Sequence, residues 1–120
     1  MENTDKLLAG FLGMKPHHND SNVMILNING INYPFEVSEL NYDTDWNRLM
    51  LVIEKIESVK IGKLYFNIQI DKDKVSLFYT HISEPTKQIE MFFEWGQENK
   101  INNTYKIVVE FVKWYNEQKK

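Results

Sequence analysis

The chain has 120 residues, of which 42% are hydrophobic and 26% charged, and its formal net charge is −3. A chain of this length is typical of one domain, so we expect residues 1–120 to form a single domain around one core. The acidic balance disfavours binding to duplex nucleic acid, and no apolar run is long enough to predict a membrane span. The absence of cysteine excludes disulfides and thiolate chemistry and favours a reducing compartment such as the cytoplasm.

The start of the chain predicts a helix followed by a loop. Residues 3–13 open with capping residues, place apolar side chains at helical spacing and end at a glycine. Residues 14–22 contain Pro16, two histidines and several Asn, Asp and Ser residues, which is turn chemistry. We therefore expect a loop over residues 14–22.

A hairpin is predicted next. Asn29-Gly30 is the dipeptide that best tolerates positive φ at both centres of a type I′ turn, and residues 23–28 and 31–35 flank it as strands. Pro34 has no N–H to donate, so the second strand is expected at a sheet edge.

A second helix is predicted over residues 45–58. Asp43 or Thr44 can cap its first turn, and its apolar side chains recur every three or four residues. The predicted apolar face consists of Trp46, Leu49, Met50, Ile53 and Ile56.

Three strands are predicted after this helix. Residues 64–70 and 75–80 alternate in polarity and flank a polar turn. Residues 87–95 fit either a helical or a strand period, and we predict a third strand because Ile89, Met91, Phe93 and Trp95 alternate with polar residues. These strands are rich in aromatic side chains. We expect core and cross-strand packing to use most of them, because platforms that stack bases come with basic grooves.

Residues 100–118 predict a long helix whose apolar arc spans about 220°, wider than one core surface requires. The main stripe consists of Ile101, Tyr105, Val108, Val112 and Tyr115. Ile107, Phe111 and Trp114 widen it and need a second cover. One hypothesis is an interface between copies of the chain, a homo-oligomer, and the other is packing by the N-terminal helix.

The predicted order is α-β-β-α-β-β-β-α. Such an order indicates an α+β fold with helices packed on a largely antiparallel sheet, an α-β-α sandwich-like arrangement.

The sequence carries no linear motif for catalysis or cofactor binding. A nucleophile elbow and a phosphate-binding glycine loop are both missing, so we predict no catalytic residue and no cofactor. His17, His18 and Asp20 hold ligand-type side chains, but adjacent loop residues rarely face one ion, and we predict no metal site. Asp43 and Asp45 are explained by helix capping rather than acid–base chemistry.

Three segments resemble a family of small bacteriophage and prophage proteins named for an α-β-α sandwich domain. These are residues 6–13 (KLLAGFLG), 42–57 (YDTDWNRLMLVIEKIE) and 108–116 (VVEFVKWYN). The resemblance implies the architecture and a phage or prophage origin, hence a bacterial host cytoplasm as location. It implies no catalytic residue.

The leading functional hypothesis is a non-enzymatic phage accessory protein that binds a host protein or a small anionic ligand, for example a signal nucleotide sequestered to counteract host defence. Arg48, the only arginine, is the best-equipped group for an anion, since its guanidinium sits near a helix N-terminus. One alternative is a small enzyme that assembles Asp43, Asp45, His81 or Arg48 without a linear motif. The other is a virion or structural component.

Overall fold

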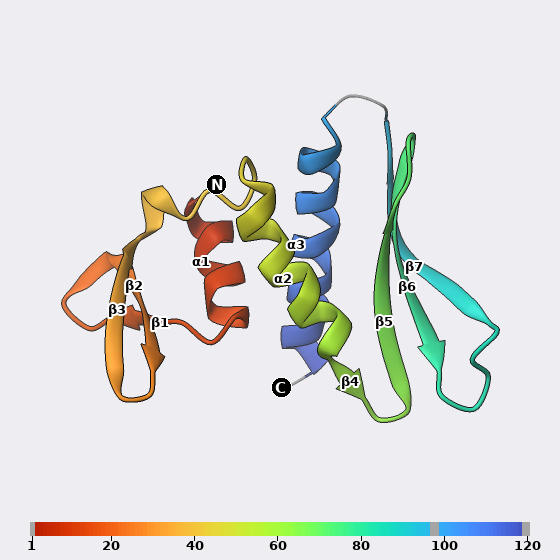
Figure 1. Cartoon of the computed structure of the whole chain (residues 1–120), viewed down its shortest axis with the longest axis horizontal. Helices are drawn as coiled ribbons and strands as arrows, with labels where there is room; N and C mark the ends of the chain where they lie inside the picture. The colour runs from red at the N-terminus through yellow and green to blue at the C-terminus, as the bar shows by residue number, and fades with distance from the viewer. Residues whose placement is uncertain (1, 97–98, 119–120) are drawn as a thin grey trace.

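The computed structural model describes residues 2–96 and 99–118, and Figure 1 shows their arrangement. The elements are α1 (Glu2–Phe11), β1 (Lys15–His17), β2 (Asp20–Ile28), β3 (Ile31–Glu36), the 3-10 helix η1 (Val37–Glu39), α2 (Trp46–Ser58), β4 (Lys60–Ile61), β5 (Leu64–Ile70), β6 (Lys74–His81), β7 (Gln88–Trp95) and α3 (Lys100–Gln118).

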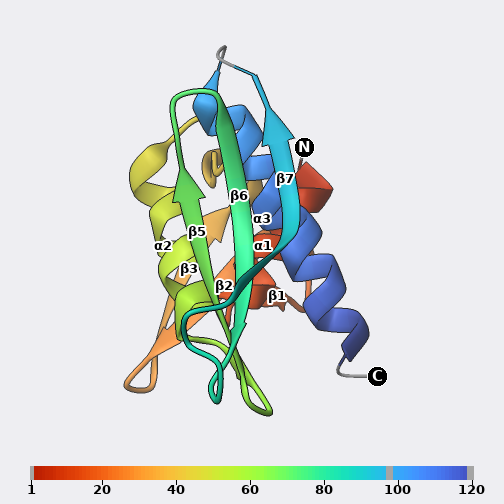
Figure 2. The ribbon, with the colours of Figure 1, turned by 90° about the vertical axis from the view of Figure 1, so that its right-hand side faces the viewer.

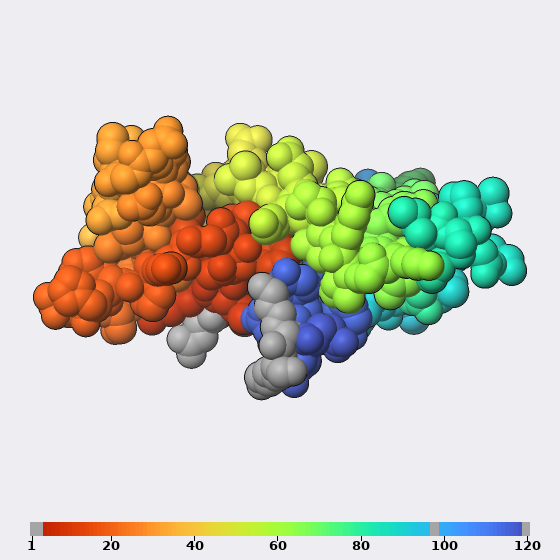
Figure 3. Space-filling view, turned by 90° about the horizontal axis from the view of Figure 1, so that it is seen from below, coloured from red at the N-terminus to blue at the C-terminus, as the bar shows by residue number. Residues whose placement is uncertain are grey.

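Helices fill the space between two antiparallel sheets. In the part of the chain that the structure describes, one sheet has the strand order β1-β2-β3 and the other the order β4-β5-β6-β7. Figure 1 and the space-filling view of Figure 3 place the first sheet at one end of the long axis and the second sheet at the other. The predicted α+β class and element order are confirmed. The middle layer is helical, whereas an α-β-α sandwich has its sheet in the middle.

The two predicted hairpins are confirmed. Asn29 and Gly30 have φ values of 53° and 85°, as a type I′ turn requires, and β2 pairs with β3 from Ile28↔Ile31 onward. Strand β3, which carries Pro34, lies at a sheet edge as expected. The third strand predicted over residues 87–95 is β7.

The loop predicted over residues 14–22 is wrong in part. Lys15 pairs with Ile25 and Pro16 with Met24, so this segment contains β1 and the start of β2. An edge strand tolerates Pro16 because only one side of its backbone needs hydrogen-bond donors. Because the composition of residues 14–22 is typical of turns, it does not predict the three-residue strand β1.

The second helix begins one residue later than predicted. Asp45, rather than Asp43 or Thr44, is its N-cap, and Asp45 Oδ1 accepts hydrogen bonds from the backbone N–H groups of Asn47 (2.9 Å) and Arg48 (3.3 Å). The buried residues of α2 are Leu49, Val52, Ile53 and Ile56. Trp46 and Met50, which were predicted for the apolar face, are each 38% exposed.

Helix α3 is the centre of the core. Phe111 is fully buried, and its ring centroid lies 6.2 Å from that of Phe11 in α1 and 5.0 Å from that of Phe66 in β5. Ile107 is also buried, and Trp114 is half-buried with its ring 5.7 Å from Phe66. The wide apolar arc of α3 is therefore covered within one chain, by a sheet on one side and by α1 on another. Ile107 and Phe111 offer no exposed surface to a second copy.

All three helices run in the same direction, so their N-terminal ends meet at one end of the molecule (Figures 1 and 2). At this end α1 is tied to α3, because the Tyr105 hydroxyl donates to Asp5 Oδ1 at 3.1 Å and also hydrogen-bonds to the Thr4 hydroxyl. Both Asp5 and Tyr105 are buried. The tie joins residues that lie 100 positions apart in the sequence.

Candidate functional site

The structure does not assemble the residues of the enzyme hypothesis. Arg48 lies in the first turn of α2, and its Nε is 3.7 Å from Asp45 Oδ2, so a carboxylate already faces the guanidinium. His81 is the last residue of β6, and Figure 1 shows β6 ending at the opposite end of the molecule from the first turn of α2. The Nδ1 atom of His81 hydrogen-bonds to the Ser83 hydroxyl at 2.6 Å. Arg48 is therefore an ion-pair partner first, and an anion would have to compete with Asp45.

The histidine pair forms a local turn structure. The rings of His17 and His18 stack with centroids 4.8 Å apart, and Asn19 donates its backbone N–H to His17 Nδ1. Across residues 2–96 and 99–118, no group of three or more metal-ligating side chains comes together.

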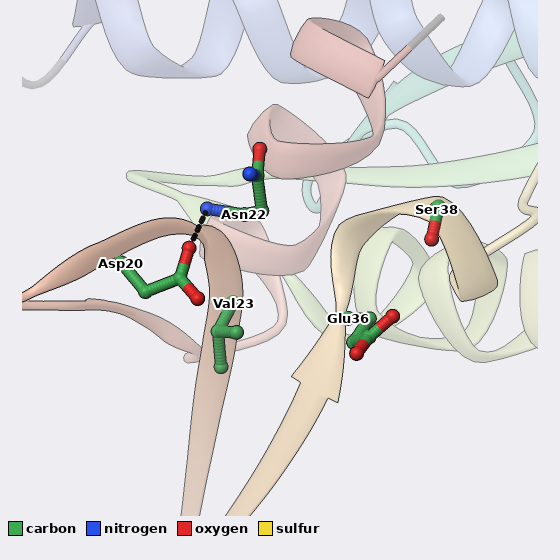
Figure 4. Close-up of a pocket in the computed structure, with 5 residues that line it drawn as sticks. All are labelled: Asp20, Asn22, Val23, Glu36 and Ser38. Carbon is green, nitrogen blue, oxygen red and sulfur yellow. Dashed lines mark hydrogen bonds between the residues drawn. The ribbon is translucent and has the colours of Figure 1, made fainter.

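A pocket of about 420 Å³ lies where β2 begins and β3 ends (Figure 4). Asp20, Asn22, Val23, Glu36 and Ser38 line it. One oxygen of Asp20 accepts the backbone N–H of Asn22 at 2.9 Å, as in an Asx turn. Both carboxylates belong to exposed residues, and the lining supplies neither a basic side chain nor an imidazole. The pocket lacks the features of a built catalytic site.

Two buried tyrosines form a structural cluster rather than a reactive one. Burial raises the pKa of Tyr105 to about 12, with the hydrogen bond to Thr4 opposing the shift and the charge of Asp5 adding to it. Burial likewise raises the pKa of Tyr42 to about 12, while the nearby charge of Arg48 opposes the shift. Both phenols stay protonated at neutral pH, and that of Tyr105 donates a hydrogen bond to the buried Asp5.

The most distinctive surface is the face of the second sheet that none of the described helices covers. Figure 1 shows the helices on one side of β5–β7 only, and Figure 2 looks onto the opposite side. We call this side the outer face. Strand alternation and pairing register assign to it the aromatic residues Tyr65, Phe78, Phe93 and Trp95 and the polar residues Asn67, Gln69, Lys74, Ser76, Thr80, Gln88 and Glu90.

A small polar network sits among the aromatic rings of the outer face. Lys74 Nζ lies 2.7 Å from Glu90 Oε2, and the Ser76 hydroxyl donates to the same carboxylate at 3.0 Å. Lys74 Nζ also lies 5.0 Å from the ring centroid of Phe93 and 4.7 Å from that of Trp95, within cation–π range. The network balances its own charge and holds the two rings around one ammonium group.

The pKa of Glu90 depends on this network. The hydrogen bond from Lys74 holds the pKa of Glu90 below its ordinary value, and the bond from Ser76 acts in the same direction. We expect Lys74→Met to raise the pKa of Glu90, as measured by NMR titration of its side-chain carboxyl. Lys72→Met, in the adjacent turn, is the matched control and should leave that pKa in place. An unchanged Glu90 pKa in Lys74→Met would contradict the geometry described above.

The exposed rings of the outer face depend on a β-bulge. Leu77 pairs with Phe92 but Phe78 pairs with Glu90, so Met91 is an extra residue in β7. Met91 and Phe92 both pack against the core, while Phe93 is 51% and Trp95 63% exposed. Uninterrupted alternation would place Met91, Phe93 and Trp95 on one face. Alternation along the sequence therefore cannot distinguish the inward-facing Met91 from the exposed Phe93 and Trp95.

No family model, curated protein or solved structure matches this chain. The resemblance to phage proteins stays a prediction. In the described residues, none of the helices combines the length and the apolar character that crossing a membrane requires.

Proposed function

We propose that this protein is a non-enzymatic binding protein that recognises a partner protein through the outer face. The supporting observation is that Phe93 and Trp95 are each more than half exposed. Their rings lie around Lys74 on a sheet face that no helix of the described residues covers. Aromatic side chains are enriched at protein interfaces, and tryptophan is among the residues enriched at the few hot spots that dominate the binding energy. Buried by a partner, these two rings would form the centre of such an interface.

Charge favours a protein over a nucleic acid as the partner. Stacking platforms for single strands pair aromatic rings with an excess of basic side chains. On the outer face Glu90 already pairs with Lys74, and the whole chain carries a net charge of −3. If the chain is a phage accessory protein, as its resemblance implies, the partner is a protein of the bacterial host.

The test is a comparison of capture by wild-type protein and by a double variant, Phe93→Ala with Trp95→Ala. We expect proteins retained from a bacterial lysate by the wild type to be lost with the double variant. Loss of one hot-spot side chain weakens binding by roughly 2 kcal/mol or more, about thirtyfold. Hydrogen exchange of the wild-type complex should show added protection in β6 and β7.

Ile31→Ala is the matched control, because Ile31 is equally exposed but lies in the other sheet. It should retain every captured protein. If the double variant still captures the same proteins, or if Ile31→Ala abolishes capture, the outer face is not the binding surface.

A further inference from the structure

The outer edge of β7 is open. Strand β7 ends the sheet order β4-β5-β6-β7, and no backbone hydrogen bond among the described residues joins its outer edge to another segment. An edge strand with unpaired N–H and C=O groups is a template for pairing with another strand. Strand β7 is eight residues long and contains neither proline nor lysine, although it carries a β-bulge at Met91 and the two carboxylates of Glu90 and Glu94.

The other sheet edges are protected. Strand β1 has only three residues, and β3 carries Pro34. On the far edge of the second sheet β4 pairs with the start of β5, and the Glu57 carboxylate accepts the N–H of Ile68 at 3.2 Å. Among the described strands, β7 is thus the longest edge strand and has no proline, so its outer edge is available for pairing with another strand.

We propose that the strand that pairs with this edge is the β7 strand of a second copy, antiparallel to the first across a two-fold axis. This proposal does not rest on the proposed function, because it concerns the backbone hydrogen bonds at the edge of β7, although Glu90, Phe93 and Trp95 belong to both the strand and the outer face. Antiparallel partners share a face of the sheet, and the bulge at Met91 shifts the alternation within β7. In one register, residues on each face of the sheet lie opposite residues on the same face along the whole strand. This register pairs Ile89 with Glu94, Glu90 with Phe93 and Gln88 with Trp95 of the other copy.

This register is also compatible with the charges and the shape of the edge. Neither Glu90 nor Glu94 faces another carboxylate, because each lies opposite an apolar side chain of the other copy. Ile89 is 50% exposed in the single chain. In the pair it lies opposite Glu94, beside a pocket of about 300 Å³ that Glu94, Tyr105 and Val109 help to line. The exposed isoleucine of each copy thereby gains apolar cover from the other.

The first test uses charge at position 89. We expect wild-type protein at about 100 µM to be a dimer by light scattering, and Ile89→Glu to weaken dimerisation roughly tenfold, because two like-charged pairs form with Glu94. Ile89→Lys should keep the dimer, since lysine faces the same carboxylate. Adding Glu94→Lys to Ile89→Glu should restore it. A monomeric wild type, or equal loss with both charges at position 89, would overturn the proposal.

The second test exploits the absence of cysteine. Ile89→Cys and Glu94→Cys proteins, mixed and oxidised, should form a disulfide-linked heterodimer. Either protein alone should not, because residue 89 of one copy lies about 17 Å along the strand from residue 89 of the other, beyond disulfide reach. This measurement does not depend on how the charge variants fold. Efficient crosslinking of a single variant with itself, or none in the mixture, would refute the register.

Discussion

Phe111→Ala is expected to lower the free energy of unfolding by about 3–5 kcal/mol, which is a large share of the 5–15 kcal/mol typical of a domain. The Phe111 side chain is fully buried, and its ring lies within 6.2 Å of the rings of Phe11, Phe66, Trp114 and Tyr115. Removing it leaves a cavity between the second sheet, α3 and α1. Urea denaturation followed by circular dichroism measures the effect.

Phe93→Ala provides the matched control for this prediction. It deletes the same number of atoms from a side chain that is 51% exposed on the outer face. We expect it to cost less than about 1 kcal/mol, as surface substitutions do. Similar losses for the two variants would mean that α3 is not the central element of the core.

Stability should fall steeply at alkaline pH. Folding raises the pKa of Tyr42 and of Tyr105 from 10.0 to about 12, so the folded chain keeps two protons that the unfolded chain loses in this range. The contribution of these protons is complete below pH 10 and is lost as the pH rises toward 12. The slope reaches about 2.7 kcal/mol per pH unit when both tyrosines differ between the two states.

The double variant Tyr42→Phe with Tyr105→Phe isolates this effect, because all other ionisable groups are shared with the wild type. Its stability at neutral pH should be lower, since the hydrogen bond from Tyr105 to Asp5 is gone. Its decline between pH 10 and 12, measured by urea denaturation at stepped pH, should be shallower. Parallel declines in the two proteins would show that these phenols titrate normally in the folded state.

Local sequence signals were sufficient for most elements. The Asn29-Gly30 turn, α2 and α3 follow from short-range rules of turn geometry and helical spacing, which hold whatever the tertiary surroundings. Which face of a helix is buried does depend on the surroundings. Met50 was predicted for the core in place of Val52, because periodicity fixes a spacing but not the direction from which neighbouring elements approach.

The order of the layers and the exposed outer face could not be predicted from the sequence. The wide arc of α3 indicates a second cover, and the sequence leaves open whether a second copy or the N-terminal helix supplies it; the fold identifies α1 as that cover around Phe111. Likewise, a β-bulge is set by pairing between strands, so alternation within β7 could not predict that Met91 turns inward while Phe93 and Trp95 stay exposed. The surface proposed for binding is therefore a product of tertiary structure.

The tie between α1 and α3 has a consequence for synthesis on the ribosome. Asp5 emerges 100 residues before its partner Tyr105, an interval of roughly 5–20 s at typical elongation rates of about 5–20 residues per second. During that time the apolar side chains of α1, including Leu8 and Phe11, have no α3 to pack against. The core can close only after residues 100–118 leave the ribosome. Until then the apolar face of α1 that packs against α3 stays uncovered by it on the nascent chain.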